Sequence, residues 1–259
     1  RACLVGCGRM GNTYDDEHRG QPYFVPPHCH AGACTVIDRI TLVGAADVVE
    51  EKVDTLCERY DVPHRYTDYR EMIETENPDI VCIATRPINH AEITVFAAEC
   101  DVKGIYCEKP LCCSMTEADA MFAACENRGV KFNYGTNRRF MPLFWKMREF
   151  IDAGKLGDVH SVTAFASTLA QWGLTHAADM LLYLAQDAEI EFVQGHVTYD
   201  EDDFADNRMN TDPFVNMGYI HFKNGVKGYV VEGTHYEFEV SGPQGRLRSI
   251  NNTGDLSWK

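Results

Sequence analysis

Three glycines near the start of the chain have the spacing of a turn that binds the pyrophosphate of a dinucleotide. Gly6, Gly8 and Gly11 follow a predicted strand at residues 1–5 and fit the pattern G-x-G-x-x-G. Glycines here allow a tight turn from strand to helix, close approach of the backbone to a pyrophosphate and close helix packing. Free N–H groups at the start of the next helix would bind the phosphates. We therefore predict a cofactor-binding loop made of Gly6, Gly8, Arg9, Met10 and Gly11.

An aspartate at the end of the next predicted strand is the candidate for binding the ribose. Asp47 follows the apolar residues 40–46, at about twice the ~20-residue spacing that is usual after such glycines. We ascribe the extra length to an insertion at residues 14–35. The carboxylate would repel a 2′-phosphate and no arginine adjoins it, so the sequence favours NAD over NADP. The same position is compatible with a simple helix N-cap.

The insertion contains side chains of the types that bind zinc. They are His18, His28, Cys29, His30 and Cys34. Their spacing matches no familiar structural zinc pattern, so we predict no metal site. A lid or a subunit contact is the favoured role for residues 14–35.

A lysine at the end of a short apolar segment is the first candidate for catalysis. Residues 105–107 predict a buried strand that delivers Lys109 to its end, where Pro110 stops it. Upstream the sequence has nucleotide-binding features, and downstream the pattern of elements changes. A lysine at such a junction can face a cofactor held by the first half and a substrate held by the second. A plain salt bridge to Glu108 is the alternative.

A histidine in the second half is the candidate partner of Lys109. Thr175 predicts the cap of a helix over residues 176–185, which would aim His176 toward the junction. Imidazole titrates near neutrality and so can take a proton from a reacting group. The alternative is that His176 merely begins a capped helix.

Two different architectures must position these residues. Over residues 1–135, buried apolar strands alternate with helical patterns, which predicts a Rossmann domain with a doubly wound parallel sheet. Residues 136–259 predict a mainly antiparallel open sheet with helices on one face, including a hairpin at Asn224-Gly225. The first domain would bind the dinucleotide and the second the substrate. The open face of the second sheet predicts a homodimer or homotetramer.

Composition excludes several classes of partner. The formal charge of −15 argues against nucleic acid and anionic membranes, which need clustered Lys and Arg. No apolar run approaches the ~20 residues that span a bilayer. The 11 cysteines are an odd count and several fall in predicted buried strands, so we expect reduced thiols. We expect a cytoplasmic protein with a small-molecule substrate.

The motifs together resemble the glucose-fructose oxidoreductase and inositol dehydrogenase family (Gfo/Idh/MocA). The matches run in order along almost the whole chain. They are the glycine motif, Ala45-Ala46-Asp47, Thr85 leading to His90, Glu108-Lys109-Pro110, Arg138-Arg139-Phe140 and His176-Ala177-Ala178-Asp179.

The resemblance implies NAD(P)-dependent oxidation of a hydroxyl carbon on a sugar, cyclic polyol or related compound. Lys109 would hydrogen-bond the reacting hydroxyl and stabilise developing alkoxide character, and His176 would take the proton. Beyond the glycine loop, the cofactor residues would be Asp47, Thr85, His90, Glu108 and Lys109. The substrate residues would be Lys109, Arg139, Trp172, His176 and Asp179.

The chain departs from the family pattern in front of His176. Family dehydrogenases commonly carry an aspartate where this chain has Trp172, and the family usually runs longer. An indole at this position predicts a more apolar pocket or stacking on a sugar ring. It also motivates an alternative function, a dinucleotide sensor or complex subunit with weak chemistry. A third possibility is epimerase, lyase or glycosidase chemistry assisted by NAD.

Overall fold

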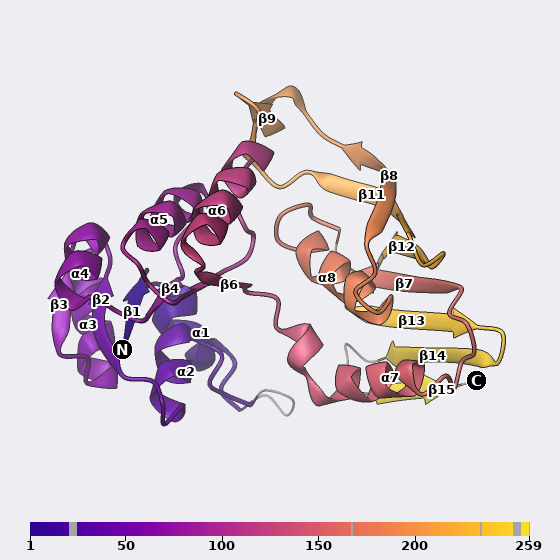
Figure 1. Cartoon of the computed structure of the whole chain (residues 1–259), viewed down its shortest axis with the longest axis horizontal. Helices are drawn as coiled ribbons and strands as arrows, with labels where there is room; N and C mark the ends of the chain where they lie inside the picture. Colours follow the sequence, from indigo (N-terminus) through magenta and orange to yellow (C-terminus); the bar gives the residue numbers. More distant parts are fainter. Residues whose placement is uncertain (21–24, 167, 234, 251–254, 259) are drawn as a thin grey trace. The chain divides into compact units, whose positions relative to one another are not determined.

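The chain forms two compact units, Arg1–Gly135 and Thr136–Lys259. The computed structural model describes residues 1–20, 25–166, 168–233, 235–250 and 255–258 (Figure 1). Each unit has its own sheet and its own core, and each is described by itself below. No helix in the described ranges is both long and apolar enough to cross a membrane.

Unit 1 is built on a six-stranded sheet in which every neighbouring pair of strands is parallel. The strand order is β3-β2-β1-β4-β5-β6, which is the order of a dinucleotide-binding Rossmann fold. The strands are β1 (Ala2–Val5), β2 (Leu42–Ala46), β3 (His64–Tyr66), β4 (Ile80–Ile83), β5 (Gly104–Cys107) and β6 (Lys131–Tyr134). The edge strand β3 was not expected, because its His-Arg-Tyr sequence has no apolar run.

Helices cover both faces of this sheet. Buried side chains of α4, α5 and α6 form one core with the strands, and those of α2 and α3 form another. This arrangement confirms the predicted doubly wound fold. The helices are η1 (Arg9–Thr13, a π-helical turn), α1 (Tyr14–Glu17), α2 (His30–Val36), α3 (Glu50–Tyr60), α4 (Tyr69–Glu76), α5 (Pro87–Glu99) and α6 (Met115–Arg128). α6 is capped by Ser114 at its start and by Gly129 at its end.

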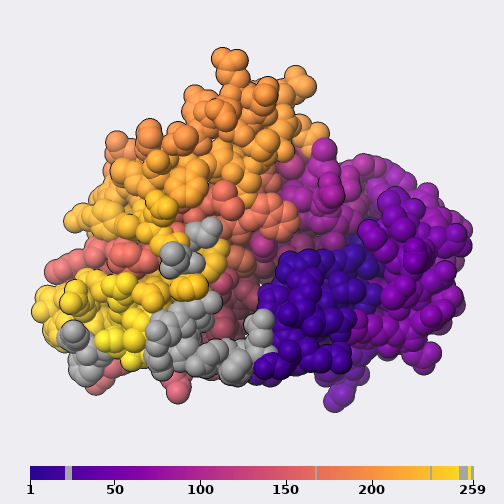
Figure 2. All heavy atoms as spheres, turned by 180° about the vertical axis from the view of Figure 1, so that it is seen from behind, coloured from indigo at the N-terminus to yellow at the C-terminus, as the bar shows by residue number. Residues whose placement is uncertain are grey.

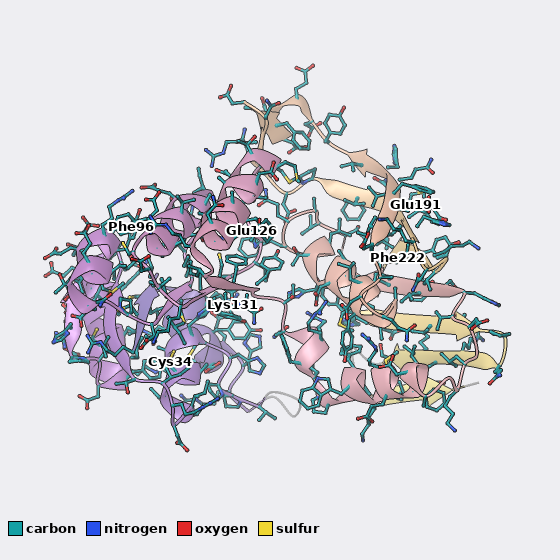
Figure 3. The ribbon with its side chains drawn as sticks, in the orientation of Figure 1. Cys34, Phe96, Glu126, Lys131, Glu191 and Phe222 are labelled. Atoms are coloured by element: carbon teal, nitrogen blue, oxygen red, sulfur yellow. The ribbon has the colours of Figure 1, made fainter. Side chains whose placement is uncertain are left out.

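One part of the insertion, α2, is built into the core of unit 1. In α2, His30, Ala31 and Cys34 are buried, and Cys34 (labelled in Figure 3) belongs to the core beneath β1 and β2. This corrects the prediction of a lid or subunit contact for residues 30–36. Burial of its small apolar face explains why so short a helix forms within a polar stretch. Residues 21–24 of the insertion lie outside the described ranges.

Unit 2 is built on a seven-stranded sheet in the order β15-β14-β13-β7-β12-β11-β8. All neighbouring strands are antiparallel except β7 and β12, which are parallel. The strands of this unit are β7 (Ser161–Ala166), β8 (Ile190–Thr198), β9 (Phe204–Ala205), β10 (Arg208–Met209), β11 (Phe214–Phe222), β12 (Lys227–Glu232), β13 (Glu237–Gly242), β14 (Gly245–Ile250) and β15 (Asp255–Trp258). The small pair β9 and β10 forms a separate ribbon.

Two helices lie on one side of the second sheet, as predicted (Figure 1). They are α7 (Pro142–Asp152) and α8 (Leu174–Leu184), and two short 3-10 turns, η2 (Arg138–Phe140) and η3 (Glu201–Asp203), complete the unit. Phe222 at the end of β11, labelled in Figure 3, is fully buried in the core that the helices form with the sheet. The predicted hairpin joins β11 to β12. Seen from behind, the orange and yellow atoms of the residues that follow α8 form much of the surface of this unit (Figure 2).

Candidate active site

The predicted cofactor residues gather at one edge of the unit 1 sheet. Gly6, Asp47, Thr85 and Lys109 come directly after β1, β2, β4 and β5 or one residue later. Because these strands are parallel, their carboxyl ends lie at the same edge. The strand order reverses between β1 and β4, and such a switch point is where α/β sheets bind ligands.

Gly6 is held in a conformation that suits only glycine. Its φ is +99°, and a Cβ would lie 2.6 Å from the carbonyl oxygen of Ala84 in the loop after β4. A Cβ on Gly11 would lie 2.1 Å from the Gly6 carbonyl oxygen. These contacts draw the glycine loop tightly against the switch point. Both glycines therefore serve the turn and the packing that the sequence pattern predicts.

Gly8 differs from the other two glycines of the motif. A Cβ added there would meet no atom within 4 Å. The loop thus leaves open space beside Gly8, at the position where this motif admits a pyrophosphate. The arrangement fits a bound dinucleotide. Arg9 is ion-paired with Glu17 of α1 at 2.7 Å and lies over the Tyr14 ring.

We expect Gly6→Ala to lower the free energy of unfolding by about 2 kcal/mol or more, because alanine is strained at positive φ and would collide with Ala84. Gly8→Ala is the matched control, since it adds the same methyl group in open space at a φ of −80°. Denaturant unfolding measures both changes. Gly8→Ala should retain wild-type stability while weakening NAD binding. Equal stability of the two variants would refute this account of the loop.

Asp47 braces the glycine loop. One carboxylate oxygen accepts the N–H of Cys7 at 2.9 Å, and the other accepts the N–H of Val49 at 3.0 Å. The residue at the N-cap position of α3 is Val49, so Asp47 is not the cap itself. The carboxylate stands half-buried beside the loop. It holds the loop, and the predicted contact with a ribose hydroxyl stays a prediction.

His90 links two loops at this edge of the sheet. Its ring is fully buried, with Nδ1 2.9 Å from the carbonyl oxygen of Pro110 and Nε2 3.2 Å from that of Thr85. Burial lowers its pKa below the ordinary 6.5, which favours the neutral ring. The neutral ring carries a single N–H, so it donates to the carbonyl of either the Thr85 loop or the segment after Lys109 and packs against the other. A role of His90 at the cofactor would be exerted through these two loops.

Lys109 follows a buried carboxylate. Glu108 is 7% exposed, and its Oε2 accepts the backbone N–H of Lys109 at 3.0 Å. The Lys109–Pro110 peptide is cis, and the Lys109 side chain is half-buried. Gly135, after β6, is pressed against this turn, since a Cβ there would lie 3.1 Å from the Lys109 nitrogen. The turn that carries Lys109 is therefore closely confined.

His176 lies in the first turn of α8 in unit 2. The helix begins at Leu174 with Gly173 in the N-cap position, so the prediction that Thr175 is the cap is wrong. Tyr236 holds this end of the helix: its hydroxyl donates to the Gly173 carbonyl at 3.0 Å, and its ring meets the His176 ring edge-on at 5.6 Å. The guanidinium carbon of Arg138 lies over the Tyr236 ring, 3.8 Å from its centroid.

The backbone of the loop before α8 is hydrogen-bonded to a carboxylate that the sequence did not predict. Asp212 accepts the backbone N–H of Gln171 at 2.6 Å and that of Trp172 at 3.2 Å. The Trp172 side chain is 49% exposed. Asp212 lies 40 positions further along the chain than Trp172, and nothing in its local sequence marks this pairing. Tyr236 also lacks a motif of its own.

Two of the predicted substrate residues bind each other. Arg139 and Asp179 form an ion pair at 2.7 Å, and Arg139 also reaches Asp187 at 3.3 Å. The pair ties η2 to α8. Both side chains are largely buried, at 26% and 14% exposure, so their immediate role is to hold these two elements together.

The thiol and imidazole groups of the insertion have protein partners. The Cys29 thiol donates to Asp15 at 3.2 Å and contacts the Tyr60 hydroxyl at 3.2 Å. His30 lies 3.1 Å from Glu108. Across the described ranges, His, Cys, Asp and Glu side chains nowhere gather in threes as a metal site requires, and no disulfide joins the cysteines there.

Comparison with known proteins agrees with this fold. The model of the oxidoreductase family with an NAD-binding Rossmann fold, Gfo/Idh/MocA, matches residues 1–136. The chain belongs to this family. Membership confirms the predicted resemblance and identifies an NAD-binding oxidoreductase of the dehydrogenase type.

Named relatives of this oxidoreductase include a myo-inositol 2-dehydrogenase and a levoglucosan dehydrogenase. Myo-inositol 2-dehydrogenase from Thermotoga maritima is 28% identical over 272 aligned positions, covering 97% of this chain and 75% of that protein. Levoglucosan dehydrogenase from Pseudarthrobacter phenanthrenivorans is 30% identical over 158 positions, which cover 61% of this chain and only 38% of that protein.

Solved structures share the fold of the whole chain. An NAD-binding oxidoreductase from Klebsiella pneumoniae superposes with a TM-score of 0.77 at 18% identity, over all of this chain and 78% of that one. The WlbA dehydrogenase from Bordetella pertussis, in complex with NADH and UDP-GlcNAcA, gives a TM-score of 0.76 at 19% identity, over all of this chain and 81% of that one.

Proposed function

We propose that this oxidoreductase transfers hydride between NAD and a hydroxyl carbon of a sugar, cyclic polyol or related compound. The observation that carries the proposal is the shared edge of the unit 1 sheet, where the open space beside Gly8 and the confined turn of Lys109 occur together. The names of the relatives, inositol, apiose and levoglucosan dehydrogenases, favour carbohydrate-like substrates.

In this proposal the chain supplies a cation and a base. The Lys109 ammonium donates a hydrogen bond to the reacting hydroxyl oxygen and stabilises the negative charge that develops there. His176 takes the hydroxyl proton, and NAD, when bound, would supply the acceptor for the hydride. The protein holds NAD through the loop from Gly6 to Gly11, through Asp47 and through the Thr85 loop.

Assays of the full chain with NAD and a panel of sugars and cyclitols test the proposal, with the absorbance of reduced nicotinamide as readout. Oxidation of at least one compound, coupled to equal formation of NADH, is the expected result. Binding of NAD by calorimetry with no turnover of any compound would instead support a dinucleotide sensor or complex subunit. The exposed indole of Trp172, in place of a carboxylate, is the feature that favours this second function.

Asp47 is expected to set the preference for NAD over NADP. Asp47→Asn removes the charge that opposes a 2′-phosphate, so the ratio of the kcat/KM values for NAD and NADP should fall about tenfold, equivalent to ~1.4 kcal/mol. Asp54→Asn is the matched control, because Asp54 is an exposed α3 carboxylate paired with Arg65 at 3.1 Å. An unchanged ratio in Asp47→Asn would remove Asp47 from the ribose site.

We further infer a homo-oligomer formed through the open face of the unit 2 sheet. Exposed apolar side chains of β8, β11 and β12 gather there, with Phe192 stacked on His221 at 5.1 Å. They include Phe192, Met217, Tyr229 and Val231. A face of this kind is self-complementary about a two-fold axis, so a second copy of the chain is the expected partner.

Light scattering tests the inferred contact. Val231→Glu places a charge on the apolar face and should shift the protein from an oligomer to a monomer. Met115→Glu serves as control, because Met115 is 76% exposed at the start of α6 in the other unit. A wild-type monomer at micromolar concentration, or an oligomer that survives Val231→Glu, would contradict the inference.

A further inference from the structure

The carboxylate beside the catalytic candidate is buried and needs hydrogen-bond donors. One carboxylate oxygen of Glu108 accepts the backbone N–H of Lys109 at 3.0 Å, and the other is hydrogen-bonded to Nε2 of His30 at 3.1 Å. A buried carboxylate without donors is costly, so both contacts stabilise its position. Gly135 closes the remaining side, since a Cβ there would lie 3.1 Å from Glu108 Oε2. Glu108 thus has little freedom to move.

The donor comes from the insertion. His30 is the first residue of α2, is 4% exposed and packs its ring 5.1 Å from that of Tyr106 on β5. The residues just before α2 are also held in place, because Asp15 accepts the backbone N–H groups of His28 and Cys29 at 2.8 and 3.2 Å. The histidine is therefore presented to Glu108 by an anchored helix end.

We propose that His30 is a positioning residue for Lys109. Its Nε2–H holds the Glu108 carboxylate, and that carboxylate holds the backbone of Lys109 at the cofactor edge of the sheet. The histidine of the insertion is thereby part of the active site without touching substrate or cofactor. The catalytic part of this inference rests on the proposed dehydrogenase function. The hydrogen bonds that link His30, Glu108 and the Lys109 backbone do not depend on it.

The experiment compares His30→Leu, which removes the donor, with His30→Gln, whose amide can still donate to Glu108. His28→Leu is the control, because it changes an exposed histidine of the same segment. Hydrogen exchange with mass spectrometry follows the Lys109 amide in overlapping peptides of residues 104–111. Steady-state kinetics with a substrate from the panel gives kcat and the KM for NAD.

His30→Leu should speed exchange of the Lys109 amide and lower kcat about tenfold or more, since small displacements of a catalytic group cost that much. The KM for NAD should change less than about threefold, because the glycine loop is untouched. In His30→Gln, the exchange rate of the Lys109 amide and kcat should both return most of the way to their wild-type values. His28→Leu should match wild type in both. A general loss of folding would not produce this split between kcat and KM or its rescue.

Two results would overturn the proposal: wild-type exchange at Lys109 in His30→Leu, or equal impairment of the leucine and glutamine variants. If His30→Leu does not fold, Glu108→Ala, which removes both acceptor oxygens, replaces it, and unchanged exchange of the Lys109 amide there overturns the proposal equally. If wild-type protein oxidises no compound, the dehydrogenase proposal fails, and the exchange measurement still decides whether His30 holds this turn.

Discussion

Replacing Lys109 with alanine is expected to lower kcat by about 10²- to 10³-fold, the loss typical of removing one preorganised group that stabilises developing charge. NAD binding should weaken far less than kcat falls, because the loop around Gly8 and the Asp47 carboxylate remain. Lys109 is half-buried in a turn held by Glu108 and Gly135, so the backbone from which its ammonium extends is restricted. Such preorganisation is what makes a cation effective in the transition state.

Lys103→Ala is the matched control for this variant. Lys103 lies just before β5, is exposed and pairs with Asp79, so its loss removes the same charge from the opposite end of the same strand. Calorimetry with NAD and steady-state kinetics separate binding from chemistry. A Lys109→Ala enzyme with wild-type kcat, or one whose only defect is a raised KM, would exclude Lys109 as the group that stabilises the alkoxide.

Replacing His176 with asparagine should lower kcat by about 10²- to 10⁴-fold, the usual contribution of a general base. The rate should also lose its dependence on the protonation of one group, so the acid limb of the pH–rate profile should flatten. Asparagine keeps a polar side chain in the first turn of α8, where Tyr236 contacts the native ring. The fold of unit 2 should therefore survive.

His196→Asn provides the comparison, since His196 is an exposed residue of β8. Its pH–rate profile and kcat should match those of wild type. An unchanged acid limb in His176→Asn, even with a lower kcat, would mean that another group takes the proton. Tyr236 would then be the first residue to test, because its hydroxyl and ring meet the same helix start.

Local sequence determined the Rossmann unit and the cofactor edge of this protein. A glycine at φ +99°, apolar strands of four or five residues and a proline after Lys109 each act on the backbone within a few positions. Such signals can be interpreted without knowing the rest of the fold. The hairpin between β11 and β12 was predictable for the same reason. The short helix α2 was not, because its stability comes from burial against the sheet.

Tertiary structure alone decided which polar groups meet. His30 and Glu108 are 78 positions apart, Trp172 and Asp212 are 40 apart, and Arg139 binds Asp179 at the same separation of 40. Each of these side chains can bond to many partners, and its choice depends on which elements the fold brings within about 3 Å. Sequence therefore named the residues that could do chemistry, whereas the folded chain determined which of them are held in place, and by what.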